Sequence, residues 1–250
     1  CASMLHASTF HSACVRILRR SISKLGYDSN FTIYDTDDSQ RLMKSCIADA
    51  DVSEKQFPPR AVLTEISLAK DRMCSPEYFC IEAGSDYRKM VIGKLYKEYQ
   101  NRLKSANALD FDDLIYKTVE LLESFPEELE YYQNRFRYIM VDEYQDTNHA
   151  QFRLVQLLSQ KHQNLCVVGD DDQSIYRFRG ATIENILNFE KQFQNAVVIR
   201  LEQNYRSTKT ILEAANDVIA HNAGRKEKTL WTDLEDGKKI IWYKAVDETD

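Results

Sequence analysis

Tyr138-Ile-Met-Val-Asp-Glu-Tyr-Gln-Asp-Thr-Asn148 is the stretch of sequence that decides the fold. A short apolar run, 138–141, leads directly into the acidic pair Asp142 and Glu143. Such a run is typical of a buried strand, and the ligands of open parallel sheets bind beyond the carboxyl ends of their strands. We therefore predict a strand here that ends at a functional site.

The residues that follow alternate between short apolar runs and helical periodicity. The runs at 165–168, 197–201 and 240–243 predict further strands. Helices are predicted between and around them at about 149–160, 183–193 and 208–222. Strands that alternate with helices indicate an α/β fold built on a parallel sheet.

The residues before this stretch have a helical period instead. Phe10, Cys14 and Ile17 lie on one stripe of a helix that Gly26 would end. Further helices are predicted at about 37–50, 60–71, 86–104, 111–124 and 127–136. The chain therefore combines an α/β part with a large all-helical block.

Composition is that of a soluble, folded protein. Of the 250 residues, 43% are apolar and only 7 are Gly and 4 are Pro, which excludes collagen-like and Gly/Pro-rich disordered chains. No apolar run approaches the roughly 18 residues that a membrane span needs, and we expect no secretory signal. The 6 cysteines form no CxxC pair, so we expect reduced, mostly buried thiols. The net charge of −6 offers nucleic acid no general attraction, although residues 1–25 carry basic residues and no acid.

The acidic pair at 142–143 suits a nucleotide-hydrolysing site. Asp142 could hold Mg²⁺, and Glu143 could orient or deprotonate the attacking water. The alternative is that Asp146 and Thr147 cap the next helix while the other acids are solvated. Capping does not explain two acids immediately after a buried strand, so we favour the hydrolytic interpretation.

The second predicted strand leads into Gly169-Asp-Asp-Asp-Gln-Ser-Ile-Tyr-Arg-Phe-Arg-Gly-Ala181. Three adjacent carboxylates repel one another unless a cation, hydrogen-bond donors or water compensates them. Gln173 could donate to a phosphate oxygen. Tyr176, Phe178 and Arg179 combine aromatic faces with a cation, as surfaces that stack the bases of a single strand do. Taken alone, the stretch is more typical of core aromatic residues beside snorkelling arginines.

The third predicted strand leads into Glu202-Gln-Asn-Tyr-Arg-Ser-Thr208. Arg206 lies just before a predicted helix with Ser207 as a candidate cap. Its guanidinium could reach the charge that develops on a transferred phosphoryl group. The alternative for Arg206 is a structural ion pair with a carboxylate of the preceding motif.

Together these three segments, in this order and spacing, resemble motifs II, III and IV of superfamily 1A DNA helicases of the UvrD/Rep/PcrA type. Thr9-Phe-His-Ser-Ala-Cys-Val-Arg-Ile-Leu-Arg-Arg20 is similar to motif Ib of that family. Leu109-Asp-Phe-Asp-Asp-Leu-Ile115 is similar to a further segment that contacts DNA. The resemblance extends over nearly all of the chain.

The resemblance implies an ATP site. Asp142 would hold Mg²⁺, and Glu143 would activate water. Gln173 would sense the γ-phosphate, Arg206 would act as an arginine finger, and Tyr205 would stack on adenine. The implied cofactors are ATP and Mg²⁺.

The resemblance also implies a site for single-stranded DNA. Bases would stack on Tyr176 and Phe178, with Arg179 beside them. The other implied contacts are Phe111 from the helical block, and Thr9 and His11 at the DNA backbone. Phe178 departs from the usual Trp of the family, which leaves an aromatic face of smaller area.

A member of this family would divide the chain into parts of two RecA-like domains. We expect 1–8 and 137–200 to belong to the first, 9–136 to form its helical insertion subdomain, and 201–250 to begin the second. The phosphate-binding loop GxxxxGK[ST] occurs nowhere in the sequence, and in the family it precedes motif Ib. The expectation is a partial P-loop NTPase motor that is inactive alone.

The leading hypothesis is a fragment of an ATP-dependent helicase that moves 3′ to 5′ on single-stranded DNA. It would unwind 3′-tailed duplex in replication or repair, with proteins of those pathways as partners, in a bacterial cytoplasm near the nucleoid and without contact to a membrane. A second hypothesis is a stand-alone module that lacks ATPase activity and either binds single-stranded DNA or has a regulatory role. A third assigns Asp142, Glu143 and the carboxylates at 170–172 to a two-metal phosphodiesterase.

Overall fold

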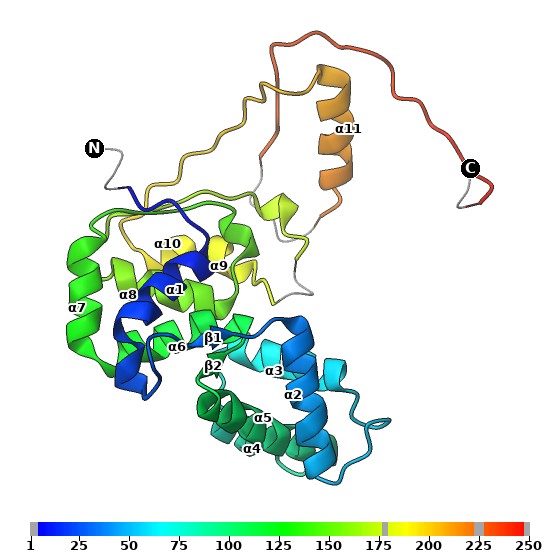
Figure 1. Ribbon diagram of the computed structural model, residues 1–250. Helices are drawn as coiled ribbons and strands as arrows, with labels where there is room; N and C mark the ends of the chain where they lie inside the picture. Colours follow the sequence, from blue (N-terminus) through cyan, green and yellow to red (C-terminus); the bar gives the residue numbers. More distant parts are fainter. Residues whose placement is uncertain (1–4, 177–179, 223–227, 248–250) are drawn as a thin grey trace.

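Helices make up most of the structure, and the strands are short and parallel (Figure 1). The computed structural model describes residues 5–176, 180–222 and 228–247. Strand β1 (Thr32–Ile33) pairs with β2 (Ala108–Leu109), and β3 (Ile139–Val141) pairs with β4 (Leu165–Val167). The chain is therefore a helix-rich α/β protein, and the parallel pairing predicted for the two strands around motifs II and III is confirmed.

The helices begin where the sequence supplies caps. Thr9 caps α1 (Phe10–Ser21), and Gly26, with a left-handed φ of 77°, ends the 3-10 turn that follows it. Capping boxes open α2 (Thr36–Asp49), α6 (Phe111–Ser124) and α8 (His149–Ser159). Proline opens α3 (Pro59–Asp71), α4 (Pro76–Ala83) and α7 (Pro126–Arg135), and Asp86 caps α5 (Tyr87–Ser105).

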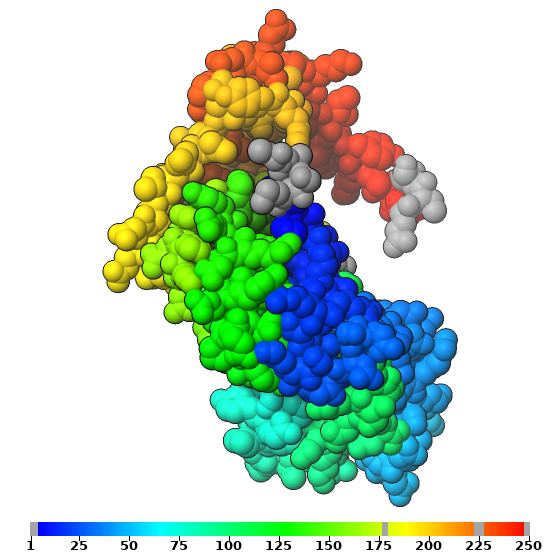
Figure 2. Space-filling view, turned by 60° about the vertical axis from the view of Figure 1, so that its left-hand side comes forward, coloured from blue at the N-terminus to red at the C-terminus, as the bar shows by residue number. Residues whose placement is uncertain are grey.

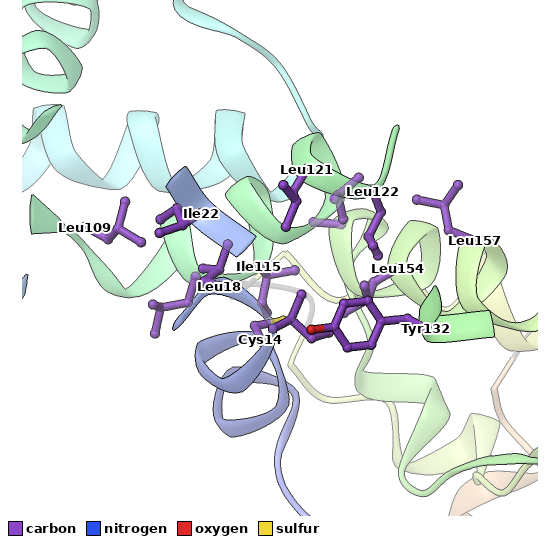
Figure 3. Packing of buried hydrophobic residues seen from close by; sticks show 14 of the residues in the cluster. Cys14, Leu18, Ile22, Leu109, Ile115, Leu121, Leu122, Tyr132, Leu154 and Leu157 are labelled. Carbon is purple, nitrogen blue, oxygen red and sulfur yellow. The ribbon is translucent and has the colours of Figure 1, made fainter. Parts of the chain in front are cut away.

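One hydrophobic cluster joins α1, α6, α7 and α8. The labelled side chains from these helices point toward one another around Cys14, Leu18 and Ile115 (Figure 3). A second cluster joins α2, α3, α4 and α5 around Tyr96, Tyr99 and Ile66. The predicted insertion at 9–136 spans both clusters, whereas packing separates α2–α5 from the helices around α8.

A buried ion-pair network connects the two clusters. The Nζ of Lys70 at the end of α3 lies 2.6 Å from Asp110 and 2.9 Å from Asp113, the two residues of the α6 capping box. Tyr99 donates to Asp110 at 3.1 Å, and Gln100 donates to Asp113 at 3.1 Å. Burial alone would lower the pKa of Lys70, but the two carboxylates outweigh it and hold the pKa above its ordinary value. The start of α6 is therefore fixed by charge as well as by packing.

Two predicted strands are wrong. Residues 197–201 and 240–243 form no strand, and Val197, Ile199 and Leu201 are 84%, 78% and 78% exposed. A parallel strand is held by hydrogen bonds to a neighbouring strand. No described segment pairs with either run, so apolar composition alone does not give a strand there.

Several other element bounds differ from prediction. The helix predicted at 183–193 is broken at Asn188 into α9 (Glu184–Leu187) and α10 (Phe189–Gln192). The last predicted helix is α11 (Lys209–Ile219), which Thr208 rather than Ser207 precedes. Helix α4 and the β1–β2 pair were not predicted, because each is short. The end of a RecA-like strand region was expected at 1–8; residues 1–4 lie outside the described residues, and 5–8 form no strand or helix.

Helix α11 and the residues near the C-terminus extend away from the helical body, which Lys228 of this part nevertheless contacts at Asp170 (Figure 1). In the space-filling view, α11 and the orange and red residues after it lie at the opposite end of the molecule from the cyan helices α3 and α4 (Figure 2). Cys14, Cys46 and Cys74 are buried, whereas Cys80 and Cys166 are exposed. None of the described helices is long and apolar enough to cross a membrane.

Lys70→Met should destabilise the protein by about 3 to 5 kcal/mol, because it leaves two buried carboxylates without their cation. Lys44→Met is the matched control, since Lys44 forms an exposed pair with Glu54 at 3.4 Å. Its cost should stay below about 1 kcal/mol. Urea unfolding midpoints of both variants measure the difference, and equal midpoints would show that the Lys70 network contributes nothing to stability.

Candidate functional site

The β3–β4 pair brings the two acidic motifs to one edge. Val141 pairs with Val167, so both strands end at the same level. The amide of Tyr144 donates to the carbonyl of Val168 at 2.9 Å, and the amide of Val168 donates to Val141 at 2.8 Å. Asp142 and Glu143 therefore lie beside the segment that begins at Gly169, as the parallel sheet predicts.

Glu143 has an unusual backbone. Its φ of 50° and ψ of 42° are left-handed, which a residue with a Cβ adopts at a cost of about 1 to 3 kcal/mol. The turn places the Glu143 amide 3.0 Å from Oδ1 of Asp142. Both side chains are exposed at the end of β3, whereas Tyr144 and Gln145 beyond them are buried. The strained turn thus holds the acidic pair outward while the next residues enter the core.

Gln145 links motif II to motif III, a role that sequence reasoning missed. Its Nε2 donates to Oε2 of Glu143 at 2.8 Å, and its Oε1 accepts from the amide of Asp170 at 2.9 Å. Gly169 is required at this contact, since a Cβ there would lie 2.6 Å from the same Oε1. Glu143 and the start of motif III are therefore held by one buried amide group.

The three carboxylates of motif III share one cation. The Nζ of Lys228 contacts Asp170 and lies 3.2 Å from Asp171 and 3.3 Å from Asp172. Burial would raise the pKa of Asp170, but hydrogen bonds from Lys228 and Gln173 outweigh it and hold the pKa below its ordinary value. The sequence predicts that a cation, hydrogen-bond donors or water must compensate these three carboxylates, and Lys228 from the C-terminal part of the chain is that cation.

Asp142, Glu143 and the carboxylates at 170–172 together form an acidic edge at the ends of β3 and β4. This acidic edge suits one Mg²⁺ better than two. Carboxylate oxygens are the ligands that Mg²⁺ prefers, and in the described structure Oδ2 of exposed Asp142 has no hydrogen-bond partner, so it is open to a cation. The oxygens of Asp170, Asp171 and Asp172 lie within 4.8 Å of one another, but the ammonium group of Lys228 already contacts all three carboxylates. This arrangement argues against the two-metal phosphodiesterase hypothesis.

Other predicted residues of the ATP site are only partly brought together. Gln173 is exposed beside the acidic edge, and its Nε2 donates to Asp170 at 2.8 Å. Tyr205 and Arg206 are also exposed; Tyr205 donates to Gln203 at 2.8 Å, and the Arg206 amide donates to Asn204 at 2.9 Å. Within the described residues, no hydrogen bond or ion pair joins either side chain to the acidic edge. The alternative ion pair of Arg206 with the preceding motif is likewise not found in that part of the chain.

The N-cap of α8 is Asn148, which forms a capping box with Gln151. The alternative assignment of Asp146 and Thr147 as caps is therefore wrong. The Thr147 hydroxyl instead donates to the Tyr144 carbonyl at 2.7 Å, within the 3-10 turn Tyr144–Asp146. Capping accounts for none of the acids at 142–146.

A groove of about 1220 Å³ runs between the α2–α3 layer and the helices α1, α6 and α8. Three predicted DNA contacts line it: His11, Phe111 and Tyr176. The His11 and Phe111 rings stack with centroids 3.8 Å apart, and Phe111 is 58% exposed. Thr9 does not line the groove; its hydroxyl caps α1 at Ser12. Phe178 and Arg179 lie outside the described residues.

The groove is acidic. Among the residues that the structure describes, its charged lining residues are Asp35, Asp71, Asp110, Asp112 and Asp146, against Arg60 and Lys70. Burial raises the pKa of Asp71 to about 7, and Asp112 adds to the shift. Burial also raises the pKa of Asp112 and of Asp146. A ligand of this groove must therefore gain its affinity mainly from its apolar faces rather than from its charge.

The sequence matches two family descriptions, one after the other. Residues 1–194 match the UvrD/REP helicase N-terminal domain, and residues 199–250 match the UvrD-like helicase C-terminal domain. The chain belongs to the UvrD/Rep helicase family. The boundary between the two matches falls where the helical body gives way to the C-terminal part.

The relatives of this UvrD/Rep family member include bacterial helicases. ATP-dependent DNA helicase PcrA of Bacillus subtilis is 53% identical over 241 residues, which cover 96% of this chain and 32% of the relative. PcrA of Staphylococcus epidermidis and PcrA of Staphylococcus aureus are each 52% identical over 249 residues, covering 100% of this chain and 34% of the relative. The chain thus spans about a third of the length of the curated relatives it matches.

Gln145→Leu should loosen the link between motifs II and III. The Asp170 amide would lose its partner, at a cost of about 1 to 3 kcal/mol. Hydrogen exchange at that amide, measured by NMR, should therefore become faster. Gln192→Leu on the exposed face of α10 is the control and should leave stability within about 0.5 kcal/mol. Unchanged exchange at Asp170 would contradict the bridging role of Gln145.

Proposed function

We propose that the chain is the central part of a PcrA-like, ATP-dependent DNA helicase and that single-stranded DNA binds in the groove between α3 and α6. The observation that carries the proposal is the joint lining of this groove by His11, Phe111 and Tyr176. These residues are far apart in sequence and come from α1, α6 and the motif III segment. Their aromatic rings offer the π-faces on which bases of a single strand stack.

The ATP half of the proposal rests on the acidic edge. Asp142 offers a carboxylate oxygen that would hold Mg²⁺, and the ion would supply positive charge beside the phosphate groups of ATP. Glu143 would take a proton from the attacking water, or orient it, from the strained turn beyond β3. The amide of Gln145, 2.8 Å from Oε2 of Glu143, keeps that carboxylate in one orientation. Gln173, exposed at the same edge, would donate to the γ-phosphate.

One segment links the two halves. Gln173 stands at the acidic edge and Tyr176, three residues later, lines the groove. A shift of Gln173 on loss of the γ-phosphate would therefore be transmitted along a very short backbone path to an aromatic contact with DNA. Such a link supports a motor in which hydrolysis changes the grip on bases.

The remaining residues of the ATP site complete the proposal. Tyr205 would stack on adenine and Arg206 would stabilise the transferred phosphoryl group after the C-terminal part closes on the acidic edge. Phe178 and Arg179 would extend the base-stacking surface beyond Tyr176. Movement from 3′ to 5′, unwinding of 3′-tailed duplex, and partners from replication or repair near the nucleoid are further parts of this proposal.

We also propose a division into domains that follows the packing. Helices α2–α5 share one hydrophobic cluster, which supports a helical insertion of about 36–105 rather than 9–136. Helices α1, α6 and α7 would then belong with α8 and the β3–β4 pair to the first RecA-like domain. The residues from 201 onward, which include α11, would begin the second.

A second candidate function is a module that binds single-stranded DNA without hydrolysing ATP. The groove alone supports it, since its aromatic lining does not depend on the acidic edge. The strained turn at Glu143 and its buried amide partner favour the motor, because a binding module has no need for either.

Glu143→Gln in the full-length protein should slow ATP hydrolysis by roughly 10² to 10⁴, the usual contribution of a positioned base, while ATP and DNA binding persist. The substitution keeps an oxygen for the Gln145 amide, so the fold should not change. Steady-state phosphate release with saturating single-stranded DNA measures the effect. Glu65→Gln, an exposed change on α3, serves as the control. A turnover number equal to that of the parent would refute the assignment of Glu143.

Phe111→Ala should weaken binding of single-stranded DNA by about one to two decades, since stacking contributes roughly 1 to 3 kcal/mol per base. The dependence of affinity on salt should stay nearly unchanged, because no phosphate contact is lost. Fluorescence-anisotropy titrations at several salt concentrations test both points. Tyr78→Ala, an exposed aromatic residue on α4 outside the groove, is the control. Parent-like affinity in a folded Phe111→Ala protein would remove the groove from the DNA-binding surface.

A further inference from the structure

Asp71, the last residue of α3, connects the groove to both acidic motifs. Its Oδ1 accepts a hydrogen bond from Nδ2 of Asn148 at 2.5 Å, and Asn148 caps α8 directly after motif II. Its Oδ2 faces Gly180, where a Cβ would lie only 2.5 Å away. Gly180, with a φ of 81°, ends the motif III segment that contains Tyr176. One carboxyl group thus contacts Asn148, just after motif II, and Gly180, near the end of motif III.

The segments that follow motifs II and III also contact each other directly. The amide of Thr182 donates to the carbonyl of Thr147 at 3.0 Å, and Nδ2 of buried Asn185 donates to that carbonyl at 3.0 Å. Two hydrogen bonds to the Thr147 carbonyl therefore join the segment just before α8 to the residues after Gly180. Asp71 lies on the groove side of this contact, among the residues that line the groove.

We propose that Asp71 is a positioning residue that takes up a proton from solvent when single-stranded DNA enters the groove, and that the proton links DNA occupancy to the contact between α3, α8 and Gly180. This inference rests on the proposed function of the groove. The proton would add to Oδ2, because Oδ1 is engaged by Asn148. Protonation makes the carboxyl neutral and leaves the Asn148 bond in place.

The charges around Asp71 favour this step. Of the charged groups that line the groove, Asp112 on α6 acts on Asp71 and opposes its ionisation. Lys70, its neighbour on α3, is already paired with Asp110 and Asp113. Within the described part of the chain, the other charged or titratable groups of the groove are Asp35, Arg60 and Asp146, together with His11 and the tyrosines, Tyr176 among them.

Asp71 changes its ionisation near neutral pH. Because burial and Asp112 raise its pKa to about 7, Asp71 is partly ionised at neutral pH. DNA phosphates would oppose the ionised form further, so binding should raise this pKa and draw in a proton. Affinity should then be high below pH 7 and fall as the pH rises through it. Burial lowers the pKa of His11, so that His11 is already neutral over most of this range.

The test compares the full-length parent, Asp71→Asn and Asp28→Asn without nucleotide, using a thymidine oligonucleotide as the probe. Between about pH 6.5 and about pH 8, parent affinity should fall by about threefold to tenfold, as one linked proton predicts. Asp71→Asn should lose most of this fall. Asp28→Asn, an exposed change outside the groove, should behave as the parent does.

Calorimetry of the parent in two buffers with different protonation enthalpies gives a second readout that needs no variant. Near pH 7 it should detect uptake of a fraction of one proton per DNA-binding event. A parent-like pH dependence in Asp71→Asn, or no proton uptake in the parent, would overturn this inference alone. Absence of DNA binding by the parent at every pH would overturn the proposed function together with it.

Discussion

The ion pairs of buried Lys70 are the constraint on which the rest of the structure depends. Lys70 lies in the last turn of α3, in the cluster of α2–α5, and its two partners form the capping box of α6 in the other cluster. Phe111 is the first residue of α6, so its direction into the groove follows from where that capping box is held. Removal of Lys70 would leave both carboxylates buried without their cation, which is strongly destabilising. The start of α6, which carries Phe111, is thus held to the end of α3 by one ammonium group.

Motif III joins the acidic edge to the groove over a short stretch of backbone. It begins at Gly169 against the buried amide of Gln145, passes Gln173 at the edge, reaches Tyr176 in the groove and ends at Gly180 against Asp71. Both ends of the segment therefore contact side chains that touch motif II or the cap of α8.

Local signals in the sequence predicted most helices and the parallel pairing of β3 with β4, because caps, prolines and apolar periodicity act within a few residues. The motifs at the ends of these two strands were placed correctly for the same reason. The strand expected at 197–201 was wrong because a strand depends on a partner that its own residues do not specify. Gln145, Lys228 and Asp71 escaped prediction because their roles arise from contacts 25, 58 and 77 residues away in the chain. The groove is likewise a product of packing, although three of its lining residues were identified from the family resemblance.

Photo-crosslinking tests the central claim, that single-stranded DNA lies in the groove between α3 and α6, most directly. The full-length protein would be irradiated with an oligonucleotide that carries 5-iodouracil, and the crosslinked peptides mapped by mass spectrometry. Iodouracil reacts preferentially with stacked aromatic side chains, so the account predicts crosslinks at Phe111, Tyr176 or His11. Crosslinks confined to the exposed aromatic residues of α4 and α5, Tyr78 and Tyr87, would contradict it and place the DNA on the outer face of the helical part.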